Sequence, residues 1–165
     1  MKDVSKKVAY YGCLTGLSLL LSYVESLLPA FFGVPGAKIG LANLVTVFAL
    51  YTGSPQSALC VNFLRLLLSG LLFGNLFSIL YSAAGCLLSF AVMFLLKKTE
   101  KFGIPAVSAA GGVFHNLGQL FVAALLAGKA VLSYFPYLFL CGVLSGIVIG
   151  IAGGIIVQRL KNVIK

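Results

Sequence analysis

Residues 132–157, LSYFPYLFLCGVLSGIVIGIAGGIIV, form an apolar run without a single charged side chain. A helix needs about 20 predominantly apolar residues to cross the hydrocarbon core of a bilayer, and this run exceeds that length. The run is also too long for a β-strand and does not alternate between polar and apolar residues. It therefore predicts a transmembrane helix and, with it, an all-α membrane protein.

Further apolar runs precede this one, and glycine, proline and asparagine residues that favour turns separate them. At 165 residues the chain has room for one domain, so we predict a single integral membrane domain that covers residues 1–165. The second run is short for a complete crossing. The six predicted helices are Val8–Leu28, Ile39–Tyr51, Gln56–Phe73, Leu76–Leu96, Ile104–Ala127 and Leu132–Val157.

The charged residues predict how the chain sits in the membrane. Charged side chains make up 9% of the sequence, against about 25% in globular proteins. Nine of the 12 basic residues lie at the termini and in the fourth connection, whereas Lys38 and Lys129 lie on the opposite side. Basic residues are retained in the cytoplasm, so both termini are predicted to be cytoplasmic in a multi-pass protein of the cell membrane. Their clustering between apolar runs indicates the bilayer, and no nucleic acid, as the partner.

The scarcity of acidic residues argues against catalysis. The only carboxylates are Asp3, Glu25 and Glu100, whereas a prenyl diphosphate synthase needs clustered aspartates to hold magnesium on a diphosphate. A single histidine and isolated cysteines provide no haem, zinc or C-x-x-C site, and there is no ATP-binding glycine loop. We predict that the chain is not an enzyme and binds neither a metal nor a cofactor.

Polar residues inside the predicted helices are the candidate ligand-binding residues, because each costs a few kcal/mol in hydrocarbon unless it faces protein or water. At about 1.5 Å of rise per residue, the charged members and Asn43 fall in the outer half of the membrane, where they can surround one cavity open to the outside. The candidates are Glu25, Lys38, Asn43, Asn62, Arg65, His115, Asn116 and Gln119.

Two interpretations of these residues remain open. Arg65 forms a structural ion pair with Glu25, helps to hold an anionic ligand, or does both. Lys38, which follows a Pro-Gly-Ala turn into a helix, adds a second positive charge and favours an anion. His115, Asn116 and Gln119 form either a hydrogen-bonded layer between helices or a recognition surface for a ligand headgroup.

Small residues form a second pattern. Glycines recur at every fourth position from 142 to 154 in the last helix and predict close helix packing. A similar face on the first helix, formed by Ala9, Gly12 and Gly16, predicts either packing or the docking of a partner membrane protein.

Four blocks of the sequence resemble the Gx transporter family, often labelled heptaprenyl diphosphate synthase component I. They are Glu25–Pro29, Pro35–Asn43, Arg65 with Ser69–Gly74, and His115–Gln119. This family is similar to the S components of energy-coupling factor (ECF) transporters, which implies a six-helix bundle with a ligand site toward the outer face. The resemblance also implies docking of a coupling subunit, which works with ATPases, at Ala9, Gly12 and Gly16, and links to isoprenoid and quinone metabolism and flavin-based extracellular electron transfer.

Together these observations predict an S-component-like substrate-binding or transport protein. Its ligand would be a small or amphipathic anion, such as an isoprenoid diphosphate or a quinone precursor. Lys38, Asn43 and Arg65 would hold the anionic head, Glu25 would orient Arg65, and the residues around His115 would line the deeper wall. The alternatives are a membrane subunit of a quinone-linked electron-transfer assembly and an accessory subunit of a prenyl diphosphate synthase.

Overall fold

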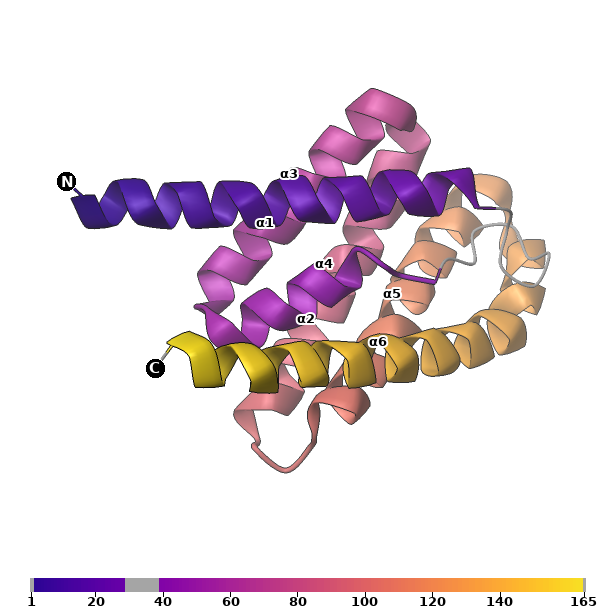
Figure 1. Cartoon of the computed structure of the whole chain (residues 1–165). Helices are drawn as coiled ribbons and strands as arrows, with labels where there is room; N and C mark the ends of the chain where they lie inside the picture. The colour runs from indigo at the N-terminus through magenta and orange to yellow at the C-terminus, as the bar shows by residue number, and fades with distance from the viewer. Residues whose placement is uncertain (1, 29–38, 165) are drawn as a thin grey trace.

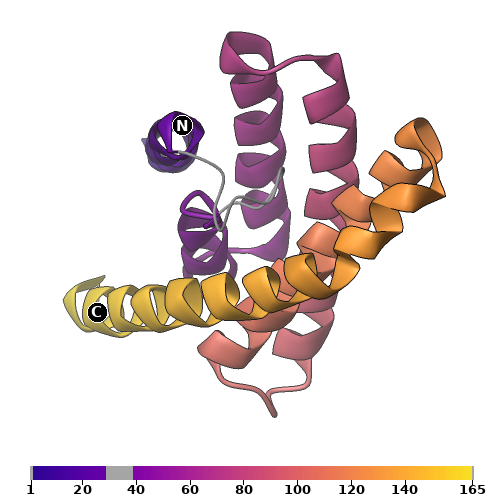
Figure 2. The ribbon, with the colours of Figure 1, turned by 90° about the vertical axis from the view of Figure 1, so that its right-hand side faces the viewer.

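The computed structural model describes residues 2–28 and 39–164, with side chains for residues 4–28 and 39–160. This part of the chain folds into helices and turns without any strand, so the predicted all-α class is confirmed (Figure 1). α1 begins and α6 ends on the same side of the bundle in Figures 1 and 2. The elements are α1 (Lys2–Leu27), α2 (Asn43–Thr52), α3 (Pro55–Phe73), α4 (Leu76–Lys98), α5 (Ile104–Ala127), the 3-10 helix η2 (Lys129–Tyr134) and α6 (Phe135–Ile164).

Turn residues explain where the helices begin. α2 begins at Asn43 rather than at the predicted Ile39, because Gly40 has a φ of +80°, which glycine adopts readily and a helix does not allow. The Ser54 side chain caps α3 by accepting a hydrogen bond from the Ser57 backbone, and Asn75 and Ser78 form a capping box at α4. The predicted start of the last helix is wrong by three residues, since the segment before Phe135 is 3-10 helix.

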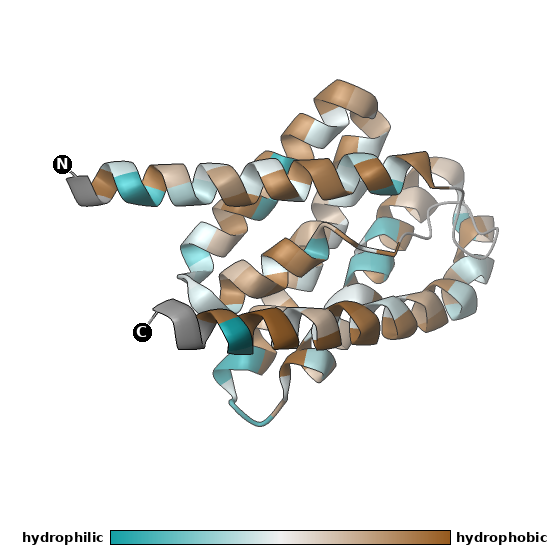
Figure 3. Ribbon diagram, in the orientation of Figure 1, coloured by the Kyte–Doolittle hydropathy of each residue, from teal (hydrophilic) through white to brown (hydrophobic). Residues whose placement is uncertain are grey.

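Within the described residues, four helical segments are long and apolar enough to cross a membrane. They are α3, α4, α5 and the run Lys129–Leu160, which joins η2 to α6. α2 has ten residues and is too short for a full crossing. The ribbon is predominantly hydrophobic along these segments, and hydrophilic residues gather in the connection between α4 and α5 (Figure 3). The chain is therefore a multi-pass membrane protein, while six crossings and cytoplasmic termini stay predictions.

Glycines let α5 pack closely against both of its neighbours. A Cβ at Gly142 of α6 would lie 2.9 Å from the backbone of Gly112, and one at Gly146 would lie 2.5 Å from Ala109 Cα. The helix-packing prediction for the glycines of the last helix is thus confirmed at these two positions. A Cβ at Gly118 of α5 would lie 2.8 Å from a backbone oxygen of α4.

The apolar core occupies one end of the bundle. It combines most of α2 with the N-terminal halves of α3 and α5 and the C-terminal parts of α4 and α6, around Leu50 and Met93. Lys97, at the end of α4, donates a hydrogen bond to Leu50 O and lies over the Tyr51 ring, with Nζ 5.1 Å from its centroid. The opposite halves of α3, α4, α5 and α6 are left to surround a polar cavity.

Candidate functional site

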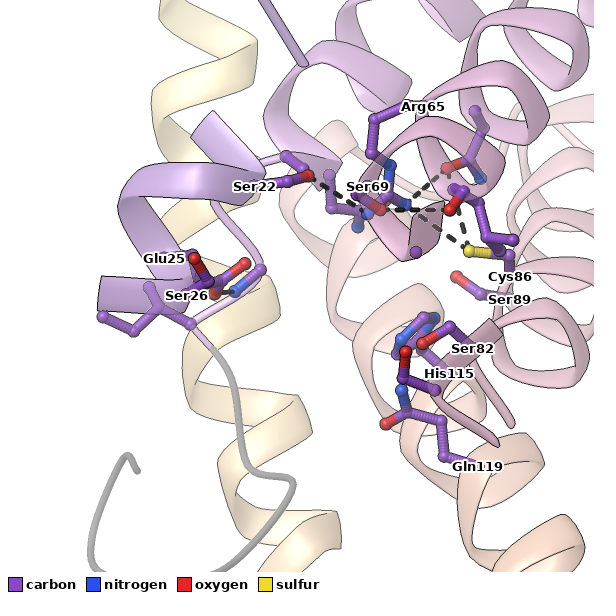
Figure 4. Close-up of a pocket in the computed structure, with 18 of the residues that line it drawn as sticks. Ser22, Glu25, Ser26, Arg65, Ser69, Ser82, Cys86, Ser89, His115 and Gln119 are labelled. Carbon is purple, nitrogen blue, oxygen red and sulfur yellow. Dashed lines mark hydrogen bonds between the residues drawn. The ribbon is translucent and has the colours of Figure 1, made fainter. Parts of the chain in front are cut away.

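A polar cavity of about 310 Å³ lies between α1, α3, α4, α5 and α6, with the start of α2 at its edge. In Figure 4, Ser82, His115 and Gln119 lie below Arg65 and Cys86, and Glu25 lies to the left of them. Seven serines and five side-chain amides contribute to its wall. The candidate residues that line it are Glu25, Asn43, Asn62, Arg65, His115, Asn116 and Gln119.

Arg65 is the central charged group of this cavity. Its guanidinium donates hydrogen bonds to Asn62 Oδ1 at 2.7 Å, to Ser22 Oγ at 3.4 Å and to Cys86 Sγ at 3.5 Å. These contacts connect α1, α3 and α4 around one positive charge. The buried Nε has no hydrogen-bond partner within the described residues.

Glu25 does not neutralise this charge. Its carboxylate accepts a hydrogen bond from the backbone N–H of Gly40, which joins the end of α1 to the turn before α2. Within the described part of the chain no ion pair joins Glu25 to Arg65, because the guanidinium is directed to Asn62, Ser22 and Cys86. The structural ion pair, one of the two interpretations of Arg65, is therefore wrong for this structure.

The α5 residues form the wall opposite Arg65. Gly85 of α4 allows His115 and Gln119 to approach, because a Cβ there would lie 2.7 Å from His115 O and 2.9 Å from Gln119 Cγ. Asn116 Nδ2 donates a hydrogen bond of 2.7 Å to Leu138 O of α6, so one member of the group does link two helices. Asn116 and Gln119 are each only 8% exposed.

A row of small polar residues on α4 completes the wall and is not among the predicted site residues. Ser78, Ser82, Cys86 and Ser89 recur at spacings of four, four and three, so they share one face of the helix. Ser89 is only 3% exposed. Polar residues at helical spacing within an otherwise apolar run are the signal that could have identified this face.

The remaining predicted residues lie elsewhere. Lys38 is outside the described residues, as is the Pro-Gly-Ala turn before it. Ala9, Gly12 and Gly16 are exposed on α1 and do not line the cavity. A Cβ at Gly12 or Gly16 would meet nothing within 4 Å, so the described helices leave this face uncovered.

The charges of the cavity are few. Among the described residues of its lining, Arg65 is the one arginine or lysine, His115 the one histidine and Glu25 the one acidic side chain. No group of three His, Cys, Asp or Glu side chains gathers in the described part of the chain to hold a metal ion. The arrangement can bind through one positive charge surrounded by hydroxyl and amide groups.

A family model described as heptaprenyl diphosphate synthase component I matches residues 14–156, a range that includes every described residue of the cavity. Neither a search of curated proteins nor a search of solved structures finds a match to the chain.

Proposed function

We propose, from the premise that this chain belongs to the heptaprenyl diphosphate synthase component I family, that it is a non-catalytic membrane protein that binds an anionic ligand in its polar cavity. The observation that carries the proposal is the guanidinium of Arg65. It lies in the cavity among neutral partners, and no carboxylate of the described residues pairs with it. A positive charge inside a membrane protein is costly without a counter-charge, and a bound anion supplies one.

The other cavity residues have roles that follow from their positions. Asn62 holds one side of the guanidinium, while Asn43 and Glu25 stand at the edge near the turn before α2. His115 and Gln119 face the body of the ligand from α5. Lys38 remains a proposed contact to the anionic head on the strength of its sequence position.

Native mass spectrometry of the purified protein in nanodiscs tests this proposal. We expect the wild-type protein to carry or accept an anionic small molecule that Arg65→Gln binds at least about tenfold more weakly, because a hydrogen bond to a charged group is lost. The matched control is Arg159→Gln, which removes an exposed arginine of α6 outside the cavity. Equal occupancy in Arg65→Gln and wild type would contradict the assignment.

The description "component I" implies a protein that works with another subunit. The uncovered face of α1 at Ala9, Gly12 and Gly16 is the surface on which we place that subunit. An ECF coupling subunit with its ATPases would make the chain the ligand-binding part of a transporter. A flavin-bearing or quinone-linked partner would make it a subunit of an electron-transfer assembly, and a prenyl diphosphate synthase would make it an accessory subunit.

A further inference from the structure

Four polar side chains of the cavity have no hydrogen-bond partner within the described part of the chain. They are Asn43 at the start of α2, Ser82 and Ser89 on α4, and Gln119 on α5, and all four line the cavity. Ser89 is 3% exposed and Gln119 is 8% exposed, so neither is well solvated by bulk water. Buried polar groups in folded proteins are almost always hydrogen-bonded, so we expect water or a ligand held in the cavity to complete these bonds.

These groups are continuous with the anion-binding end of the cavity. Ser82, Cys86 and Ser89 lie along one face of α4, and the Arg65 guanidinium reaches Cys86 at 3.5 Å. Gln119 faces the same space from α5, next to Ser82 (Figure 4). One molecule can therefore place its anionic group at Arg65 and its hydrogen-bonding body along Ser82, Ser89 and Gln119.

The charge and chemistry of the lining limit what that molecule can be. A diphosphate carries two or more negative charges and is commonly held together with magnesium and carboxylates. The described lining offers one guanidinium and no group of metal-binding side chains. Large apolar side chains are a minority of the wall, namely Ile39, Leu66, Phe73 and Ile149, so they form no continuous channel for a prenyl tail.

We infer that the ligand is a small hydrophilic monoanion, a carboxylate whose body carries hydroxyl or amide groups, and not an isoprenoid diphosphate. This inference rests on the proposed function, since it specifies the ligand of the same cavity. Serine hydroxyls both donate and accept hydrogen bonds, as does the amide of Gln119, so they match a body of mixed donors and acceptors.

A panel of defined probes tests the ligand class. The full-length protein in nanodiscs of neutral phosphatidylcholine is titrated with gluconate, pantothenate, glycerol 3-phosphate, inorganic phosphate, isopentenyl diphosphate and farnesyl diphosphate, with occupancy read by native mass spectrometry. We expect gluconate or pantothenate to bind more tightly than glycerol 3-phosphate, inorganic phosphate and either isoprenoid diphosphate. Each of Ser89→Ala and Gln119→Leu is expected to weaken that probe about three- to tenfold, through the loss of one or two hydrogen bonds.

Ser108→Ala is the matched control, because Ser108 is a buried serine of α5 that has no hydrogen-bond partner among the described residues and lies outside the cavity. Tighter binding of an isoprenoid diphosphate, of glycerol 3-phosphate or of inorganic phosphate would overturn the ligand class and leave the proposed function standing. Unchanged affinity in Ser89→Ala and Gln119→Leu, in proteins that elute and melt as wild type does, would overturn it as well. Failure of every probe, or equal binding by Arg65→Gln, would overturn the proposed function itself.

Discussion

The Arg65 side chain is suited to binding an anion and does not stabilise the ligand-free protein. Its guanidinium bonds to three neutral groups from α1, α3 and α4, and its buried Nε has no partner within the described residues. Holding an arginine in this way costs free energy in the empty protein, because no opposite charge repays its loss of hydration. A bound anion would offset that cost. Replacing Arg65 by an apolar residue should therefore raise the stability of the ligand-free protein and weaken anion binding.

Arg65→Met tests this opposition. We expect the ligand-free protein to gain about 1 kcal/mol of stability from replacing a partly buried charge by an apolar chain, which corresponds to a rise of about 2–4 °C in melting temperature. Anion binding should be lost in the same variant. The measurement is thermal unfolding in nanodiscs with and without a binding probe. A clear fall in melting temperature would assign Arg65 a structural role instead.

Glu25→Gln separates the two tasks of the α1 carboxylate. The amide oxygen can still accept a hydrogen bond from Gly40 N–H, while the negative charge at the edge of the cavity disappears. We expect anion affinity to rise about twofold. The effect is small because the Glu25 carboxylate lies at the edge of the cavity, where solvent and salt screen its repulsion of the anion. Glu25→Ala, which also removes the acceptor, is the comparison. Weaker binding in Glu25→Gln would show that the carboxylate itself contacts the ligand.

At the scale of elements, α5 is positioned by glycines on its neighbours. A Cβ at Gly146 of α6 would lie 2.5 Å from Ala109 Cα and 2.7 Å from Ser108 O, both too close for any real Cβ. Both are backbone atoms, which cannot rotate away as a flexible side chain can. A Cβ at this position would therefore force α5 and α6 to move apart. The same movement would displace Asn116, which donates to Leu138 O of α6.

Gly146→Ala should therefore destabilise the protein by about 1–3 kcal/mol, the usual range for overpacking a well-packed contact. Gly154→Ala is the matched control from the same row of glycines, since its Cβ would lie at an ordinary 3.9 Å from Ile104. Chemical or thermal unfolding of both variants in the same detergent checks the difference. Equal stability of the two variants would contradict this prediction, because it would show that α5 and α6 can move apart at Gly146 without a loss of stability.

At the scale of the whole molecule, the cavity and the uncovered face of α1 are separate surfaces. The cavity uses Ser22, Glu25 and Ser26 near the end of α1, whereas Gly12 and Gly16 lie nearer the middle of this helix, where an added Cβ would meet nothing within 4 Å. A protein with this arrangement can bind a ligand at one end and a partner along its side.

Gly12→Leu and Gly16→Leu test the docking surface. Since a side chain at either position meets nothing within 4 Å, we expect stability to change by less than about 0.5 kcal/mol and ligand binding to persist. Co-purification with the partner subunit should be lost. The control is Ala91→Leu, which adds the same bulk to an exposed position of α4. Recovery of the partner by both glycine variants would contradict docking at this face.

The identity of that partner decides between the remaining functions. An ATPase pair with a membrane coupling subunit would indicate transport, a flavoprotein would indicate electron transfer, and a soluble prenyl diphosphate synthase would indicate an accessory role. The measurement is mass spectrometry of the intact complex purified through this chain, compared between wild type and the Gly12→Leu variant.

Local features of the chain are enough to predict the membrane class and most of the residues of the site. Apolar runs, turn residues and scarce charges are local properties, so the helices fall close to the predicted ranges, and α5 matches its predicted bounds. The exclusion of charge from hydrocarbon made Arg65 and the polar residues of α5 recognisable along the chain. The family match over residues 14–156 agrees with the blocks that those residues form.

Which of these groups contact one another depends on how the helices pack. Whether Glu25 pairs with Arg65 or with Gly40 depends on where the turn before α2 lies, and one φ of +80° shortens that helix. The contribution of Ser82, Cys86 and Ser89 depends on how α4 is rotated against α5, which Gly85 and Gly118 permit by close approach. Such contacts join residues far apart in the chain. Their geometry depends on how the helices pack, so local sequence patterns cannot predict it.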